Sequence, residues 1–330
     1  MGFFNWFSKN ERAKRKQARE HALLGKAVSK KPGAPLKLGL ALAGGGTRGY
    51  GHIGAIKALN EYGIKFDYVA GTSVGALIGA MFANGLSIEE MEAGAVGFKL
   101  KDITTSKIPL IPSKTDKLEA LVAEYVGDID ISELKTHFVA VAVDIVTGEE
   151  VHLSRGSLAK AVAGSCAMPG LFNPVVMGDM HLLDGCLKNT MPSDVAREMG
   201  ADIVIAIDLN SKRGYGTESI KYIEVMKVAL RVLMKTAAIK GYVASDYVVT
   251  PDLGKFKQIS VKGGEEMLEE GYRATIAAMP EILKLVGAEQ VNPDTRKMAE
   301  KLKRYEDKTK VDPKDKKILD AIENDEWEDF

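Results

Sequence analysis

Two short segments of this chain, residues 138–143 and 203–207, are apolar at every position. A strand with one face in water alternates apolar and polar residues, whereas a strand buried on both faces is apolar throughout. The stretches between such β-prone runs carry helical patterns, as expected where helices cover both faces of a sheet. The sequence therefore predicts an α/β fold with a mostly parallel central sheet sandwiched by helices.

The remaining β-prone and helical segments alternate along the chain. Further strands are predicted at residues 36–43, 66–70, 150–153, 175–176 and 181–183, and the last two form a hairpin. Helices are predicted at residues 54–62, 74–83, 88–98, 117–125, 158–163 and 222–239. The last of these is rich in methionine, and its apolar residues recur at helical spacing. We expect it to belong to the core, with a wall of an acyl-binding pocket as the alternative.

Composition excludes several classes of protein. With 45% hydrophobic and 27% charged residues over 330 positions, the chain can bury a core. Lys and Arg together number 45, as do Asp and Glu, so nucleic acid is not an expected partner. Cys166 and Cys186 are too few for a disulfide framework, and no zinc spacing occurs, which favours a reduced, cytoplasmic protein. Neither a secretory leader nor a membrane-spanning apolar run is recognised in the sequence.

The two ends of the chain differ from the middle in charge. Residues 1–31 combine four early aromatic residues with nine basic and two acidic ones, a net charge of +7, and the other end is acidic. Two interpretations stay open for the basic arm: a solvated tail, or an aromatic wedge that binds an anionic membrane surface and holds the protein at the inner face of the membrane. We divide the chain into this arm (1–36), an α/β domain (37–286) and a charged helical or disordered tail (287–330).

Residues 71–75 carry the first sign of chemistry. Gly71-Thr72-Ser73-Val74-Gly75 lies between a predicted strand and a predicted helix, which is the context of a nucleophile elbow. So sharp a turn admits only small flanking residues, and it presents the Ser73 hydroxyl beside a helix N-terminus. Taken alone, the pattern is equally compatible with a turn whose serine caps the helix.

A glycine-rich loop, Gly44-Gly45-Gly46-Thr47-Arg48-Gly49, follows the first predicted strand. Its backbone N–H groups can converge on an anion, either a nucleotide phosphate or the oxyanion formed during acyl transfer. In a dinucleotide site an acidic residue ends the second strand, whereas here Asp67 begins it, and no P-loop sequence occurs. The serine on the next strand-to-helix turn therefore favours an oxyanion hole.

A serine nucleophile needs a base. The candidate histidines are His21, His52, His137, His152 and His181. Because none follows residue 181, the usual hydrolase order of serine, acid and late histidine is absent. Asp184 instead ends an apolar strand, either as a turn-starting residue or as a base whose pKa burial would raise.

These blocks resemble the patatin-like phospholipase family over residues 38–285. The family's G-G-G-x-R-G loop, G-x-S-x-G elbow, Ser-x-Ala-x-Pro segment and Asp-Gly motif occur in order at residues 44–49, 71–75, 165–169 and 184–185. The resemblance implies a catalytic dyad of Ser73 and Asp184 without metal or cofactor. It also implies an oxyanion hole, for which the candidate residues are Gly44, Gly45, Gly46, Arg48 and Gly49. The sequence departs from the family at Cys186, where Gly or Ala is usual.

The resemblance implies a carboxylic ester hydrolase that cleaves lipid acyl esters through an acyl-enzyme, as a phospholipase A, lysophospholipase or esterase. An acyltransferase is a close chemical variant, because an alcohol can replace water as the acceptor. The alternative from another class is a regulatory protein that binds a nucleotide or phosphate at the glycine loop without catalysis.

Overall fold

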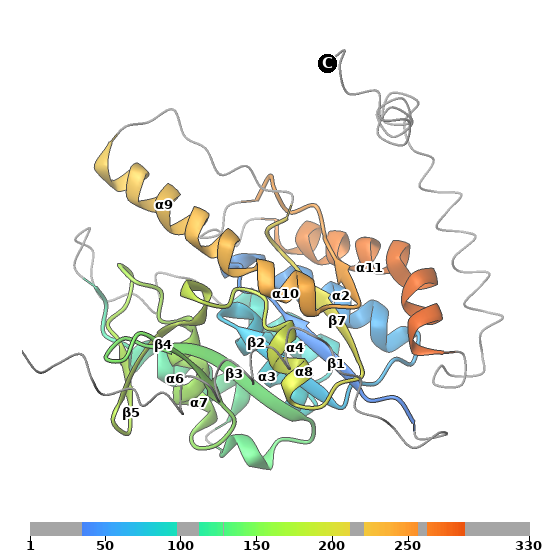
Figure 1. Ribbon diagram of the computed structural model, residues 1–330, viewed down its shortest axis with the longest axis horizontal. Coiled ribbons are helices and arrows are strands. Elements are labelled where there is room, and N and C mark those ends of the chain that lie inside the picture. Colours follow the sequence, from blue (N-terminus) through green and yellow to red (C-terminus); the bar gives the residue numbers. More distant parts are fainter. Residues whose placement is uncertain (1–34, 98–111, 128, 212–220, 257–262, 288–330) are drawn as a thin grey trace, which may run out of the picture.

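The computed structural model describes residues 35–97, 112–127, 129–211, 221–256 and 263–287, which form a sheet between layers of helices (Figure 1). The strands are β1 (Leu38–Leu42), β2 (Tyr68–Thr72), β3 (His137–Asp144), β4 (Glu149–Leu153), β5 (Val175–Met177), β6 (Met180–Asp184), β7 (Ile203–Ile207) and β8 (Tyr247–Val249). Strands β3, β2, β1, β7 and β8 run parallel, whereas β4 and β6 pair antiparallel with β3, and β5 with β6. The predicted α/β fold with a mostly parallel central sheet is confirmed.

The helices of the described residues are α2 (Tyr50–Glu61), α3 (Val74–Asn84), α4 (Ile88–Gly97), α6 (Asp116–Val126), α7 (Leu158–Cys166), α8 (Ser193–Glu198), α9 (Tyr222–Ala237), α10 (Ile239–Ala244) and α11 (Gly264–Val286). Six of them, α2, α3, α4, α6, α7 and α9, occur where helical patterns were predicted, with shifted ends, whereas α8, α10 and α11 lie where the helical patterns predicted none. Short 3₁₀ turns lie at η1 (Gly46–Gly49), η2 (Ile131–Glu133) and η3 (Gly185–Leu187). Helix α2 begins four residues before the predicted start because its glycines serve packing: a Cβ on Gly54 would lie 1.9 Å from the Leu268 carbonyl oxygen of α11.

Both faces of the sheet are buried, as the uniformly apolar strands predicted. In β1, Leu40 and Leu42 point into the larger core, which includes apolar residues of α2, α3, α7 and α11. Ala41, between them, points to the opposite face, where it belongs to a smaller core with Val195 and Ala196 of α8. Small residues on this second face let α8 approach the sheet closely.

The expectation that residues 222–239 belong to the core is wrong. Only Met234 and Ala238 among the described side chains of this segment are buried, and Val225, Met226, Val232 and Leu233 are each about half exposed. Figure 1 shows α9 extending away from the sheet, with its amino-terminal end farthest out. Helical periodicity located the helix correctly, but periodicity cannot tell whether anything covers the apolar face.

The basic arm and the acidic tail lie outside the described residues, apart from the last residues of the arm and the first of the tail. Across the described ranges, no helix is both long enough and apolar enough to cross a bilayer. The domain boundaries at residues 36 and 286 therefore stay predictions. The described elements run from β1 to α11, inside the range predicted for the central domain.

Candidate active site

Strand register brings the elbow and Asp184 together along one edge of β3. On that edge β2 pairs with the first part of β3, and its last residue, Thr72, lies opposite Val141. The antiparallel β6 takes over at the next position, where Asp184 lies opposite Ala142. Strand β4 pairs with residues 140–144 of β3 and therefore occupies the other edge. Because the carboxyl ends of β2 and β6 meet along this edge, the residues that end the two strands become neighbours although they are far apart in sequence.

Ser73 occupies a strained turn between β2 and α3. Its φ of 55° and ψ of −127° make it the one non-glycine residue with positive φ among the described residues. Such backbone strain costs on the order of 1–3 kcal/mol and persists only where the surroundings enforce it. The flanking glycines are required by space, because a Cβ on Gly71 would lie 2.3 Å from the Gly75 carbonyl oxygen. The local geometry is that of a nucleophile elbow.

The Ser73 hydroxyl donates a 2.8 Å hydrogen bond to Oδ2 of Asp184. The other carboxylate oxygen accepts from the backbone N–H of Cys186 at 2.9 Å. Burial raises the pKa of Asp184 to about 6, against the lowering effect of the hydrogen bonds from Cys186 and Ser73. A carboxylate with a raised pKa is a stronger base, and this one already accepts a hydrogen bond from the hydroxyl whose proton it would remove.

Ser165, in the segment that matched Ser-x-Ala-x-Pro, supports the elbow from behind. Its hydroxyl accepts the Ser73 backbone N–H at 2.9 Å and donates to the Val141 carbonyl at 2.6 Å. The side chain is fully buried near the end of α7. Ser165 thus ties the strained residue to β3 through two buried hydrogen bonds. The sequence marked this position only as part of a family motif, without a role.

The glycine loop lies beside Ser73. A Cβ on Gly44 would approach the Ser73 Cβ to 3.3 Å and the Cys186 sulfur to 2.1 Å, so no larger residue fits there. The Gly44 N–H donates to the Thr190 carbonyl at 2.9 Å, and its carbonyl accepts from the Asn210 side chain at 2.7 Å. Gly44 is therefore fixed as part of the loop and does not offer its N–H to a substrate.

The next two residues differ from Gly44. For the N–H groups of Gly45 and Gly46, no acceptor is found among the described residues. Gly46 also has a φ of 61°, which glycine adopts without strain. Two consecutive N–H donors without a protein acceptor, next to Ser73, can bind an oxyanion.

Arg48 and Gly49 have structural roles in the loop. The Arg48 side chain donates its hydrogen bonds away from Ser73. The Arg48 guanidinium is completely buried and donates to the backbone carbonyls of Phe256 and Leu209. Gly49 permits close contact with α3, because a Cβ there would lie 2.4 Å from a methyl group of Val74. Both residues therefore hold the loop against its neighbours.

Both cysteines lie next to the two central residues. Cys186 lies two residues after Asp184, whose carboxylate accepts the Cys186 backbone N–H at 2.9 Å, and Cys166 directly follows Ser165, which supports the elbow. Burial, followed by the charge of Asp184, raises the pKa of both thiols above the usual value. Neutral thiols of this kind are poor nucleophiles. The departure from the family at Cys186 places a weak donor where Gly or Ala offers none.

The described histidines serve other purposes, and His21 lies outside the described residues. His52 is fully buried and its Nε2 contacts the Ala43 carbonyl at 2.7 Å. His137 stacks on Tyr68, and His152 lies 2.8 Å from Glu150. His181 is exposed on β6. No hydrogen bond joins any of these four to Ser73.

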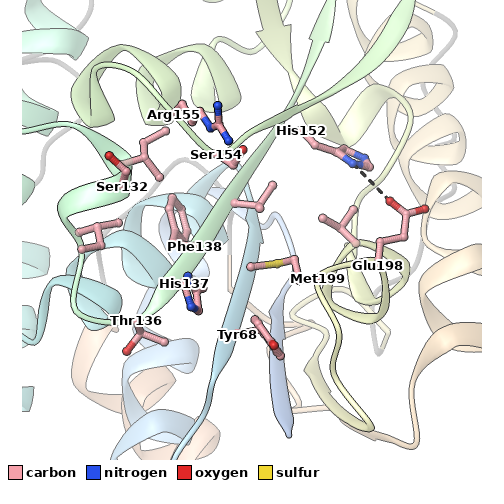
Figure 2. Close-up of a pocket in the computed structure, with 14 residues that line it drawn as sticks. Tyr68, Ser132, Thr136, His137, Phe138, His152, Ser154, Arg155, Glu198 and Met199 are labelled. Carbon is pink, nitrogen blue, oxygen red and sulfur yellow. Dashed lines mark ion pairs between the residues drawn. The ribbon is translucent and has the colours of Figure 1, made fainter. Parts of the chain in front are cut away.

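A hollow of about 590 Å³ lies at the opposite end of the strands (Figure 2). Tyr68 and His137, at the amino-terminal ends of β2 and β3, line it with His152 and Glu198, whose side chains form an ion pair at 3.5 Å. Ser73 follows the carboxyl end of β2 and Asp184 is the last residue of β6, and neither lines this hollow. Elsewhere in the described residues, no three His, Cys, Asp or Glu side chains are grouped as metal ligands.

The structure combines an α/β fold with an elbow serine that is hydrogen-bonded to a buried aspartate. Comparison with known proteins gives the family to which this arrangement belongs. Residues 40–197 match the patatin-like phospholipase family. An uncharacterized NTE family protein of Mycobacterium tuberculosis is 30% identical over 280 residues, 75% of this chain and 48% of that protein. Mouse patatin-like phospholipase domain-containing protein 6 is 34% identical over 53% of this chain and 14% of its own length. Residues 40–197, nearly half of the chain, therefore belong to the patatin-like phospholipase family.

The chain spans about half the length, or less, of the curated relatives it matches. Among solved structures, VipD from Legionella pneumophila matches with a TM-score of 0.47 and 15% identity over 75% of this chain and 67% of that chain. Human GIVD cytosolic phospholipase A2 matches with a TM-score of 0.41 and 12% identity over 85% of this chain and 64% of that chain.

Proposed function

We propose that this chain is a lipid acyl hydrolase, a carboxylic ester hydrolase with Ser73 as nucleophile and Asp184 as general base. The observation that carries the proposal is the 2.8 Å hydrogen bond from the Ser73 hydroxyl to the buried Asp184 carboxylate, at a strained elbow. Family membership supports the substrate class, an acyl ester of a phospholipid, lysophospholipid or other lipid.

In the acylation step, Asp184 takes the Ser73 proton while the serine oxygen attacks the ester carbonyl carbon. The carbonyl oxygen becomes an oxyanion, which the N–H groups of Gly45 and Gly46 and the N-terminus of α3 stabilise. The tetrahedral intermediate collapses, the alcohol portion of the lipid leaves with the proton from Asp184, and the acyl chain stays on Ser73 as an ester.

In the deacylation step, Asp184 removes a proton from water, which attacks the acyl-enzyme at the same carbonyl carbon. The second oxyanion uses the same donors, and its collapse releases a fatty acid and returns the proton to Ser73. An alcohol that replaces water at this step would give acyl transfer. No metal or cofactor takes part in this scheme.

The geometry favours this function over binding of a nucleotide or phosphate at the glycine loop. Asp67, the candidate for a ribose contact, instead accepts from the Leu38 N–H and from Lys37 before β2 begins, at the end of the sheet opposite Gly45 and Gly46. The loop also lies against Ser73, where a phosphate would meet the serine instead of open solvent.

Labelling with a fluorophosphonate probe tests the proposal, because the probe reacts only with an activated serine. The full chain should be labelled, and Ser73→Ala should lose both the label and p-nitrophenyl ester hydrolysis by at least about 10³-fold. Ser87→Ala, a hydroxyl at the start of α4, is the matched control and should keep both. Retained labelling in folded Ser73→Ala would reject the assignment.

A further inference from the structure

Helices α9 and α10 expose an apolar surface that the core does not use. At 100° per residue, Val225, Ala229, Val232 and Leu233 share one side of α9, whereas Met234 and Ala238 point to the body. All four of the first set are exposed. Ile239 and Val243 extend the exposed apolar surface onto α10.

Helix α9 is also basic. Residues 221–237 contain four basic residues and one acidic residue; these are Lys221, Lys227, Arg231, Lys235 and Glu224. Lys240 of α10 is not counted, because it is paired with two carboxylates of the body. Arg231 and Lys235 lie one turn apart beside the exposed apolar stripe. An apolar stripe bordered by cations is complementary to an anionic lipid surface, in which apolar side chains enter the interface while cations meet the headgroups.

The surface is connected to the candidate active site. The Thr190 hydroxyl donates to the Met234 carbonyl of α9 at 2.7 Å, and the Thr190 carbonyl accepts the Gly44 N–H of the glycine loop. On α10, Lys240 forms ion pairs with Glu150 at 2.6 Å and Asp194 at 3.0 Å. The helices are therefore anchored to the body by their carboxyl-terminal portion, while the amino-terminal half of α9 extends outward (Figure 1).

We propose that the exposed face of α9 and α10 docks the protein on an anionic bilayer and so brings the active site to its lipid substrate. The proposal rests on the proposed function for its choice of a lipid partner. The site for docking is distinct from the dyad, so binding and hydrolysis can be measured separately.

Co-sedimentation of the full chain with phosphatidylcholine vesicles, with and without about one-third phosphatidylglycerol, tests this proposal. The variant Val232→Ser/Leu233→Ser should bind the anionic vesicles at least about tenfold more weakly than the wild type. Val176→Ser/Leu285→Ser removes the same two residue types from exposed positions on β5 and α11 and should bind within about twofold of the wild type. Both variants should hydrolyse p-nitrophenyl butyrate as the wild type does.

Equal vesicle binding by the α9 variant and the wild type would overturn the proposal, as would no binding by the wild type. Light scattering in solution tests whether a second copy of the chain occupies this face instead. A wild-type dimer that becomes a monomer in the α9 variant would assign the face to that second copy and would also overturn the proposal. If wild-type protein binds vesicles through α9 but hydrolyses no ester, the docking surface stands and the hydrolase proposal fails. If the wild type hydrolyses esters but the α9 variant binds vesicles as the wild type does, the hydrolase proposal stands and the docking surface fails.

Discussion

The Ser165 hydroxyl accepts the backbone N–H of Ser73 and thereby fixes the one residue of the elbow that bears strain. Removing that hydroxyl leaves a buried N–H and the Val141 carbonyl without partners, which costs about 1–3 kcal/mol. It also lets the elbow relax, so Ser73 would leave the position from which it bonds to Asp184. Ser165 is a positioning residue in this view, since it touches the elbow backbone and not the substrate.

We predict that Ser165→Ala lowers kcat for a short-chain ester by about 10- to 100-fold with KM nearly unchanged. Ser193→Ala is the matched control, because Ser193 is also a buried serine and is bonded to Ser245, which follows α10, away from the elbow. It should lose similar stability and keep kcat. Steady-state kinetics with denaturant unfolding measures both quantities, and a folded Ser165→Ala with wild-type kcat would contradict the positioning role.

The raised pKa of Asp184 predicts the pH dependence of activity. The general base must be ionised, so kcat/KM should fall about tenfold per pH unit below an apparent pKa of about 6. Asp184→Asn should lower activity by at least about 10³-fold at pH 8, where the wild-type carboxylate is ionised. A pH–rate profile of the wild type from pH 4.5 to 8 checks this, and a flat profile down to pH 5 would exclude Asp184 as the base.

The same pKa predicts that the active site lowers stability. The folded-state pKa of Asp184 is about 6 against 3.8 unfolded, so the folded state binds the extra proton between these values and loses stability as pH rises through them. The loss at pH 8 is on the order of 3 kcal/mol. Asp184→Asn should therefore be more stable than the wild type at pH 8 and gain little at pH 4. Urea unfolding at the two pH values measures the difference, and an equal effect at both would refute it.

The parts of the site that the sequence revealed are local. Gly71 and Gly75 flank Ser73 within five residues, so a motif carries the whole elbow, and Asp184 was recognised by its place at a strand end. Ser165 was missed as a support because its partners, Ser73 and Val141, lie on two other strands or turns. The Gly44 N–H was assigned to the oxyanion hole for the same reason, since its acceptor, Thr190, is distant in sequence.

Helix α9 shows a different limit. The spacing of Val225, Val232 and Leu233 fixes which side of the helix is apolar, yet burial depends on what packs there, which no local pattern contains. The strands did not have this ambiguity, because residues 203–207 are apolar on both faces and must be covered twice. Local patterns therefore predict whether a segment is a helix or a strand and which of its sides is apolar. Whether another element packs on that side can be read only from the folded structure.

The basic arm gives a prediction from sequence alone. Residues 1–31 carry a net charge of +7 beside four aromatic residues, and each cation near an anionic surface contributes on the order of 1 kcal/mol before screening. Deleting them should reduce co-sedimentation with anionic vesicles at low salt while hydrolysis of a water-soluble ester is unchanged. Equal binding by the truncated and full-length chains would leave the arm as a solvated tail. Combining the deletion with the α9 variant shows whether the two surfaces act additively.

The buried His52 side chain leads to a prediction of how the free energy of unfolding changes at low pH. Its Nε2 donates to the Ala43 carbonyl, which can only accept. Its Nδ1 is buried and has no partner among the described residues, so a proton on Nδ1 would have no acceptor and the neutral ring is favoured. Burial lowers the pKa of His52 from 6.5 to about 4, against the raising effect of the Ala43 bond. Between these values the unfolded chain binds the proton and the folded chain does not, so stability falls as pH drops from 6.5 to 4, by about 3 kcal/mol.

Replacing His52 by Gln, which can still donate to Ala43, should remove this acid sensitivity. The difference in unfolding free energy between pH 7 and pH 4.5 should shrink by about 2–3 kcal/mol relative to the wild type. Asp184 acts in the opposite direction over the same range, but it is present in both proteins and cancels in the comparison. Ester hydrolysis at pH 7 should remain substantial, because the hydrogen bond of His52 goes to Ala43 and not to Ser73 or Asp184. A folded variant as inactive as Ser73→Ala would instead make a histidine essential and remove the basis for a serine–aspartate dyad.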